Sequence, residues 1–342
     1  MPTSPRPPRP DDQGDASGQS LTLQDDVGLR LALLARGATW WSLQLPVPGE
    51  AQPRELLLGG ATPQAHAVNT AYFGATIGRM ANRIAGAQIE RNGQRWALAA
   101  QPGSRHQLHG GPDGFDRRVW TLAEHTPRRA VYRLHSPVGD QGFPGAVKAE
   151  AAVTLPGGGV IDLQLSATTT AATPLCLTNH AYFNLDGARG DARAHRLTIA
   201  AAHVLPVDDE LIPLGPLLPV AGTPFDFTEA RPIGQARDGD YDHAYLLDGG
   251  PGLRPAARLV SGDGRVQLQI DTSLPALQLY TGAGLGQQTG RDGQPLPPHA
   301  GIALEPQFLP DSPHHPEWPQ PSCWLEPGQT WRHQIRYTFS AA

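Results

Sequence analysis

The chain has 342 residues, a formal net charge of −5 and 17% charged residues. This mild acidity argues against nucleic acids and anionic membrane surfaces as partners, because both attract basic proteins. No stretch approaches the roughly 18 apolar residues of a membrane span, and the first 20 residues lack the apolar run of about 7–15 residues of a secretory signal. We therefore expect a cytoplasmic protein that acts on a small, neutral molecule.

The chain contains only two cysteines, Cys176 and Cys323, which lie far apart in the sequence. This spacing provides neither a metal-binding motif nor a disulfide framework. A chain of about 300 residues buries roughly 75% of its unfolded surface, so it needs no such cross-link for stability. We expect both thiols to be buried and inert.

Residues 1–20 are rich in proline, charge and small residues, which predicts a disordered tail. From Leu21 to residue 342, short β-type runs separated by Gly, Pro and Asp predict a single all-β domain, a large antiparallel β-sandwich. The run 266–270 alternates apolar residues with glutamine, as a half-buried strand requires. Further strands are predicted at 21–23, 29–34, 40–45, 131–134, 161–165 and 331–337, whereas residues 78–85 fit either a short helix or a strand edge.

Two histidines and one glutamate lie in unusual surroundings. His180 lies in Thr-Asn-His-Ala-Tyr-Phe-Asn-Leu, His109 lies in Leu-His-Gly-Gly, and Glu305 lies within the apolar run Ala-Leu-Glu-Pro-Gln. Glutamate is almost never fully buried without a partner, and its desolvation raises its pKa and makes it a stronger base. A histidine and a glutamate in one cleft form an acid/base pair that could move protons without a cofactor. For each histidine alone, a structural role remains an alternative.

Three further polar residues are candidates for binding hydroxyl groups. Asn82 and Arg83 lie in Gly-Arg-Met-Ala-Asn-Arg-Ile, where the arginine offers a planar set of donors and the asparagine both a donor and an acceptor. Asp242 lies between aromatic residues, where its carboxylate could accept hydrogen bonds from two neighbouring hydroxyls. A surface arginine and a turn-forming aspartate are the structural alternatives.

Taken together and in this order, the motifs resemble those of the aldose 1-epimerase (galactose mutarotase) family. The resemblance extends from about residue 60 to the C-terminus. It departs at Ala181, where the family usually has a hydroxyl residue. Its specific segments are 69–70, 74–79, 82–84, 108–111, 114–116 with Trp120, 142–145, 178–180, 182–185, 206–208, 222–227, 242–243, Gln278 with 280–282, and 304–305 with Gln307, Pro310 and Asp311.

The resemblance implies a large β-sandwich that interconverts the α and β anomers of free aldoses, such as galactose and glucose, by opening and reclosing the sugar ring. It implies that Glu305 is the base on the C1 hydroxyl, that His180 is the acid on the ring oxygen, and that His109 assists there. It assigns the remaining hydroxyls to Asn82, Arg83, Asp242 and Gln278. It implies no cofactor and no metal, and the chain also lacks dinucleotide-binding and Walker-type glycine motifs.

Three alternatives remain open. A hexose-6-phosphate 1-epimerase needs an additional basic pocket, which Arg79, Arg83, Arg117 and Arg118 could form. A non-catalytic sugar-binding protein could use the same fold, although it would not need an opposed histidine and glutamate. A metal-dependent isomerase would use His109, His180 and His243 as ligands, but the chain lacks the usual His-x-His motif. The preferred aldose and the choice between a monomer and a homodimer stay undetermined.

Overall fold

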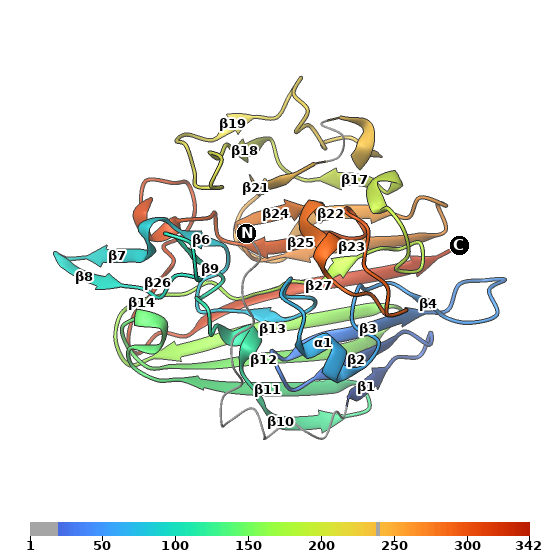
Figure 1. Ribbon diagram of the computed structural model, residues 1–342, viewed down its shortest axis with the longest axis horizontal. Helices are drawn as coiled ribbons and strands as arrows, with labels where there is room; N and C mark the ends of the chain where they lie inside the picture. The colour runs from blue at the N-terminus through green and yellow to red at the C-terminus, as the bar shows by residue number, and fades with distance from the viewer. Residues whose placement is uncertain (1–19, 237–239) are drawn as a thin grey trace.

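The computed structural model describes residues 20–236 and 240–342, so the predicted tail over residues 1–20 lies, apart from its last residue, outside the described residues. Short strands joined by turns make up most of the described chain (Figure 1). The strands predicted from the sequence are all present, and the prediction of an antiparallel all-β sandwich is confirmed. The division into a tail and a single domain over 21–342 stays a prediction.

Three sheets account for most of the strands among the described residues. The largest has nine strands in the order β10 (Thr121–Thr126), β11 (Arg129–Ser136), β12 (Val147–Gly157), β13 (Val160–Thr169), β27 (Trp331–Ala341), β23 (Val266–Thr272), β22 (Arg254–Val260), β17 (Arg196–Ile199) and β20 (Arg231–Pro232). The second has six strands in the order β16 (Tyr182–Phe183), β25 (Ile302–Gln307), β24 (Ala276–Tyr280), β21 (Asp242–Leu246), β18 (His203–Leu205) and β19 (Leu218–Pro219). The third joins β1 (Leu21–Gln24), β2 (Arg30–Leu34), β3 (Thr39–Leu45) and β4 (Arg54–Glu55).

Smaller elements connect these sheets. The two-stranded pairs are β14 (Thr173–Pro174) with β26 (Trp324–Leu325), β15 (Thr178–Asn179) with β5 (Thr76–Ile77), β6 (Arg83–Ile84) with β9 (Gln107–Leu108), and β7 (Gln88–Arg91) with β8 (Gln94–Ala97). The segment 78–85 contains the two-residue strand β6 and ends at Ala85, the first residue of a 3₁₀ turn. The short helix α1 (Pro63–Ala67) begins after Thr62, whose side chain accepts a hydrogen bond from Ala65 N. Single 3₁₀ turns are η2 (Ala85–Ala87), η3 (Phe115–Arg117), η4 (Asp140–Gly142), η5 (Ala192–Ala194), η6 (Ile233–Gln235), η8 (Ala283–Gln287) and η9 (Ser312–His314).

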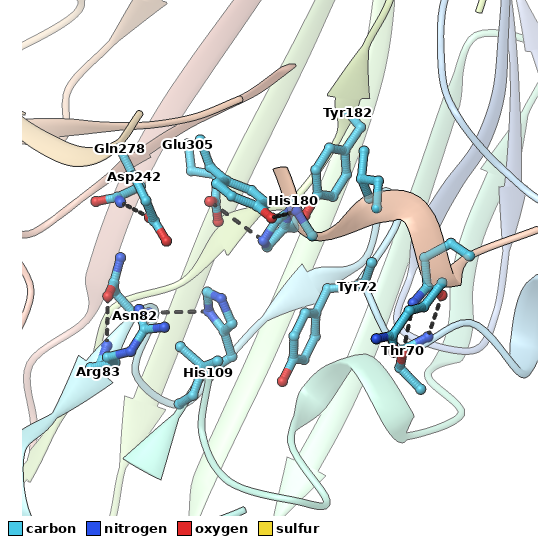
Figure 2. Close-up of a pocket in the computed structure, with 17 residues that line it drawn as sticks. Thr70, Tyr72, Asn82, Arg83, His109, His180, Tyr182, Asp242, Gln278 and Glu305 are labelled. Carbon is cyan, nitrogen blue, oxygen red and sulfur yellow. Dashed lines mark hydrogen bonds and ion pairs between the residues drawn. The ribbon is translucent and has the colours of Figure 1, made fainter. Parts of the chain in front are cut away.

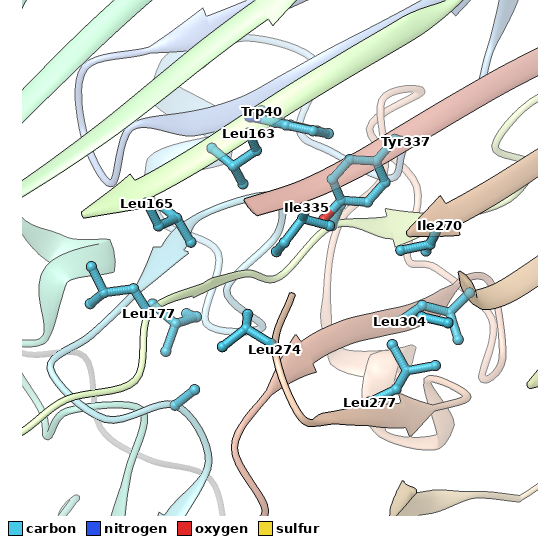
Figure 3. Close-up of a cluster of buried hydrophobic side chains, with 14 of the residues drawn as sticks. Trp40, Leu163, Leu165, Leu177, Ile270, Leu274, Leu277, Leu304, Ile335 and Tyr337 are labelled. Atoms are coloured by element: carbon cyan, nitrogen blue, oxygen red, sulfur yellow. The ribbon is translucent and has the colours of Figure 1, made fainter. Parts of the chain in front are cut away.

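The main hydrophobic core lies between the nine-stranded sheet and strands β24 and β25 (Figure 3). Val266, Leu268 and Ile270 of β23 are fully buried, whereas the glutamines between them are half-buried, as the predicted alternation requires. Trp40 of β3 meets Tyr337 of β27 edge-on, with ring centroids 4.9 Å apart. Both cysteines are buried, reduced and free, as expected. Among the described residues, no helix has the length and apolar character needed to cross a membrane.

Strands β24 and β25 are buried on both faces, and their two faces differ in chemistry. Leu277 and Leu279 of β24 and Leu304 of β25 belong to the core. Since side chains alternate along a strand, their neighbours Gln278 and Glu305 point to the opposite face. A polar side chain on that face is therefore held by a rigid, well-packed sheet and yet is withdrawn from bulk water.

Candidate active site

A cavity of about 300 Å³ opens over the polar face of strands β24 and β25 (Figure 2). It is also bordered by β6, by the segment 70–72 and by the turn η8. All seven residues predicted as catalytic or substrate-binding line this cavity, namely Asn82, Arg83, His109, His180, Asp242, Gln278 and Glu305. The fold thus brings together residues that are more than 220 positions apart in the sequence.

The pairing of strands β21, β24 and β25 places the three polar residues of the sheet side by side. Gln278 lies directly opposite Glu305, and Asp242 lies opposite Tyr280, which is two residues beyond Gln278 on the same face. The Gln278 Nε2 atom donates a hydrogen bond of 2.5 Å to Asp242 Oδ1. This bond orients the amide and the carboxylate as one unit facing the cavity.

His180 lies in the short connection between β15 and β16, and its backbone is fixed on both sides. Its N–H donates to Ala75 O, and its carbonyl accepts from Gly74 N, each at 2.9 Å. The imidazole Nε2 atom lies 3.5 Å from Glu305 Oε1, and the two side chains are 5% and 2% exposed. The predicted acid and base are therefore adjacent, close enough for one small ligand to contact both.

The surroundings of His180 and Glu305 disfavour charge on either group. Burial lowers the pKa of His180 to about 4, and burial together with the nearby Asp242 carboxylate raises the pKa of Glu305 well above its usual value. The short distance alone would suggest an ion pair, but the loss of hydration acts on both groups in the same direction. We conclude that the neutral form of the pair predominates in the ligand-free cavity.

Several polar atoms around the cavity have no partner within the described protein. They are His180 Nδ1, Glu305 Oε2 and Gln278 Oε1. A buried polar atom without a hydrogen bond is costly, and such atoms are rare in folded proteins. Their presence around one cavity indicates a surface that is completed by a polar ligand.

The hydrogen bonds of His109 determine which of its ring nitrogens carries the proton. Its Nδ1 atom accepts a hydrogen bond of 3.1 Å from Asn82 N, and the main-chain N–H of His109 donates to Asn82 O. Because Nδ1 is an acceptor, the single proton of the neutral ring lies on Nε2. Burial, with the charges of His180 and Arg83, lowers the pKa of His109 well below its usual value. His109 is therefore a fixed, neutral N–H donor.

The protonation of His109 also bears on the metal-dependent alternative. Donor atoms of His109, His180 and Glu305 all lie within 4.8 Å of one another, which is a spacing that a metal ion could use. However, an Nε2 atom that carries a proton has no lone pair for a metal, and moving the proton to Nδ1 would oppose the Asn82 N–H. His243, the third ligand of that alternative, does not line the cavity. The trio therefore fits a hydrogen-bonding site better than a metal centre.

Only one of the four arginines considered for a phosphate pocket reaches the cavity. Arg83 lines it, whereas Arg79 is buried elsewhere and donates to Ser136 Oγ, Pro144 O and Pro137 O. Arg118 pairs with Asp113 and Asp140, and Arg117 pairs with Asp116. Since the same cavity holds the carboxylates of Asp242 and Glu305, it lacks the surplus of positive charge that a phosphate requires.

Our predicted set omitted the aromatic residues that line the cavity. Tyr280 lies two positions beyond Gln278 on β24, so the two-residue period of a strand could have identified it, whereas Tyr182 begins β16 and is separated from His180 by a connection. Tyr72 belongs to a loop, where no such period applies. The remaining lining residues that we did not predict are Thr70, Ala71, Leu108, Gly284, Leu285, Gln287 and Gln288.

Comparison with known proteins relates this geometry to one family. The family model described as aldose 1-epimerase matches residues 19–338. The chain belongs to the aldose 1-epimerase family. It is 42% identical to the aldose 1-epimerase of Escherichia coli (strain K12), over 94% of this chain and 95% of that protein. It is 36% identical to the galactose mutarotase of Homo sapiens, over 96% of each.

Solved structures agree with this assignment. The crystal structure of an aldose epimerase homologue from C. elegans matches with a TM-score of 0.88 and 29% identity, covering 95% of this chain and 99% of that chain. The galactose 1-epimerase of Lactobacillus acidophilus NCFM matches with a TM-score of 0.81 and 27% identity, covering 94% of each chain. The resemblance noted from the sequence motifs is thus confirmed, and with it an isomerase of the aldose 1-epimerase type.

Proposed function

We propose that this protein interconverts the α and β anomers of free aldohexoses, such as galactose and glucose, with His180 and Glu305 as the acid/base pair. The observation that carries this proposal is the 3.5 Å approach of His180 Nε2 to Glu305 Oε1 in a buried cavity rich in hydroxyl-binding groups. Ring opening needs one proton removed from the C1 hydroxyl and one added to the ring oxygen. Both oxygens are bonded to C1, so the two protein groups must be neighbours.

The reaction proceeds by one proton transfer at each residue. The Glu305 carboxylate takes the proton of the C1 hydroxyl while the His180 imidazolium gives its Nε2 proton to the ring oxygen. The bond between C1 and the ring oxygen breaks, and C1 becomes an aldehyde. After rotation about the C1–C2 bond, His180 takes back the proton of the C5 hydroxyl, Glu305 returns its proton to the C1 oxygen, and the ring closes on the other face.

Burial of His180 and Glu305 is compatible with this chemistry, because the two forms of the pair differ only in where the protons lie. The charged form, imidazolium with carboxylate, and the neutral form, imidazole with carboxylic acid, hold the same number of protons. The ring-closed sugar reacts with the charged form, and ring opening leaves the neutral form, which burial favours. Desolvation thus drives the transfer of charge out of the pair during ring opening.

The other polar residues hold the sugar while C1 rotates. His109 presents its Nε2–H beside the His180 ring, where it can donate to the ring oxygen or to the C5 oxygen as negative charge develops there. The remaining hydroxyls are bound by Asn82, Arg83, Asp242 and Gln278. The hydrogen bond between Gln278 and Asp242 prearranges a donor and an acceptor for two neighbouring hydroxyls.

A panel of purified substrates tests this proposal. We expect rapid, enzyme-dependent loss of optical rotation for the α anomers of free galactose and glucose. We expect much slower reaction of the corresponding 6-phosphates, since only one arginine lines the cavity. Binding of these sugars without acceleration of mutarotation would favour the non-catalytic sugar-binding alternative. Faster reaction of the phosphates would favour a hexose-6-phosphate 1-epimerase.

A further inference from the structure

The imidazole of His180 lies against two tyrosine rings that come from different elements (Figure 2). Tyr182 of β16 stacks on it with a centroid distance of 4.9 Å and an interplanar angle of 26°. Tyr72, from the loop before β5, is nearly parallel to it as well, at 5.7 Å and 20°. The acid-base chemistry described above does not use either ring.

These contacts matter because the general acid must carry a proton in a place that disfavours it. Burial lowers the pKa of His180 to about 4, so the imidazolium form is scarce at neutral pH. The face of an aromatic ring carries negative charge density and attracts a cation, most strongly where water is excluded. A parallel ring offers this face to the imidazolium. Unlike a carboxylate, the ring does not compete with the imidazole for the proton.

We propose that the rings of Tyr72 and Tyr182 stabilise the imidazolium form of His180, so that they act as positioning residues that keep the general acid protonated. The proposal rests on the proposed function, since it assigns His180 the role of acid. The rings hold the imidazole plane in place and raise the fraction of the pair in its charged, productive form. Their hydroxyl groups are not required for this effect.

The remaining groups around His180 do not offer the same stabilisation. Glu305, on β25, is the base of the pair and is itself neutral for most of the time when no sugar is bound. His109 meets the His180 ring edge-on at 5.1 Å, and its charged form would repel an imidazolium. The backbone of residues 74–75 bonds to the main chain of His180 rather than to its ring. The two tyrosine rings are therefore the π-electron groups that can favour charge on His180 among the described residues.

Four variants and one control test the role of the rings. Tyr72→Leu and Tyr182→Leu remove one ring each, whereas Tyr72→Phe and Tyr182→Phe keep the ring and remove only the hydroxyl. Phe73→Leu is the matched control, because Phe73 packs edge-on against Tyr182 at 5.2 Å, whereas the rings that stack on His180 are those of Tyr72 and Tyr182. The readout is kcat/KM for galactose mutarotation between about pH 2.5 and 9, corrected for the spontaneous reaction.

We expect each leucine variant to lose about tenfold in kcat/KM at neutral pH, the scale of a desolvated cation–π contact. The acidic limb of the pH profile should move down by about one unit, so that the variants approach the wild-type rate at low pH. The phenylalanine variants should stay within about threefold, and Phe73→Leu should leave the limb in place. An equal loss at every pH, or equal losses for leucine and phenylalanine, would overturn the proposal.

A measurement that needs no activity separates this proposal from the proposed function. Histidine-selective ¹³C labelling allows the His180 ring to be titrated by NMR, with His180→Gln to assign its signal. We expect protonation of His180 in Tyr72→Leu and Tyr182→Leu to require a pH about one unit lower than in wild-type protein. An unchanged titration refutes the role of the rings even if mutarotation is confirmed. A protein that binds sugar without mutarotating refutes the proposed function, and the titration still decides whether the rings stabilise the imidazolium.

Discussion

The two faces of strands β24 and β25 are equally withdrawn from water, yet they are built for different purposes. On one face, Leu277, Leu279 and Leu304 pack into the main core. On the other face, Gln278 and Glu305 are 4% and 2% exposed and each retains an atom without a hydrogen-bond partner. The first face lowers the free energy of the folded chain by removing apolar surface from water. The second face raises it by burying polar groups that are not fully paired.

Along strand β25, a residue that stabilises the fold and a residue that serves the site are direct neighbours. Leu304 and Glu305 are covalent neighbours with almost the same exposure, 1% and 2%, but their side chains point to opposite sides of the sheet. The core face holds the strand rigidly, and this rigidity allows the polar face to hold its groups in a fixed arrangement without relaxing around them. Substitutions on the two faces should therefore change different measured quantities.

The largest effect is expected for Glu305→Gln on the polar face. The amide has nearly the same shape but cannot accept the proton of the C1 hydroxyl, so we expect kcat to fall by about 10³–10⁴-fold. Sugar binding, measured by isothermal titration calorimetry, should persist, and the free energy of unfolding should not fall. Mutarotation at a rate within tenfold of wild type, measured by polarimetry, would remove Glu305 from the role of base.

The neighbouring substitution Leu304→Ala on the core face should give the reverse result. Truncating a buried leucine removes apolar contacts and leaves a cavity, which lowers the free energy of unfolding by about 2–5 kcal/mol. Urea denaturation measures this loss. In the folded protein at low temperature, kcat should stay within about threefold of wild type. A large loss of kcat in folded protein would mean that the two faces are not independent.

The period of two residues along the strands made much of this fold predictable from the sequence. Alternation identified β23, and the apolar run around Glu305 marked that carboxylate as unusual, although the alternation along β25 was not predicted. The roles of the seven site residues, however, were predicted through the resemblance to a family, because the pattern around each residue alone was not specific. Their convergence depends on strand order, which places β25 beside β24 although the residues between them include the turn η8. Such non-local pairing leaves no local pattern in the sequence.

Other details of the site depend on backbone geometry that the motifs do not encode. Arg79 and Arg83 lie in one short motif, yet only Arg83 lines the cavity. Between them the chain turns at Asn82, which has a positive φ of 64°. The same turn directs the Asn82 N–H to His109 Nδ1 and thereby sets the position of the proton on the ring. Asn82 and His109 can be read from the sequence, but the hydrogen bond that the Asn82 N–H donates to His109 Nδ1 cannot be predicted from it.

The two arginines offer a second test of the separation between stability and function. Arg83→Gln removes a charged donor from the cavity, so we expect sugar to bind about 10–100-fold more weakly while the free energy of unfolding changes by less than about 1 kcal/mol. Arg79→Gln is the matched substitution at a buried site. It leaves the buried carbonyls Pro137 O and Pro144 O without their donor, each at a cost of about 1–3 kcal/mol, so urea denaturation should show a loss of about 2–5 kcal/mol in the free energy of unfolding. Similar effects of both substitutions on sugar affinity would place Arg79 in the binding site as well.

The smallest change in rate is expected when the pH of the wild-type enzyme is varied. The pH dependence of kcat/KM reports the pKa values of the acid and the base in the free enzyme. The productive form has a proton on His180, whose pKa is lowered to about 4, and none on Glu305, whose pKa is raised. Below about pH 4 the pair gains a second proton and Glu305 loses its function as a base. Above the raised pKa of Glu305 the pair loses its one mobile proton.

Between these limits the pair keeps the same number of protons, so its charged fraction does not depend on pH and the rate should be flat. An acidic limb near pH 6.5 would instead mean that His180 has the pKa of an exposed histidine. In that case burial on the polar face would not disfavour charge, and the contrast between the two faces of the sheet would be one of shape alone.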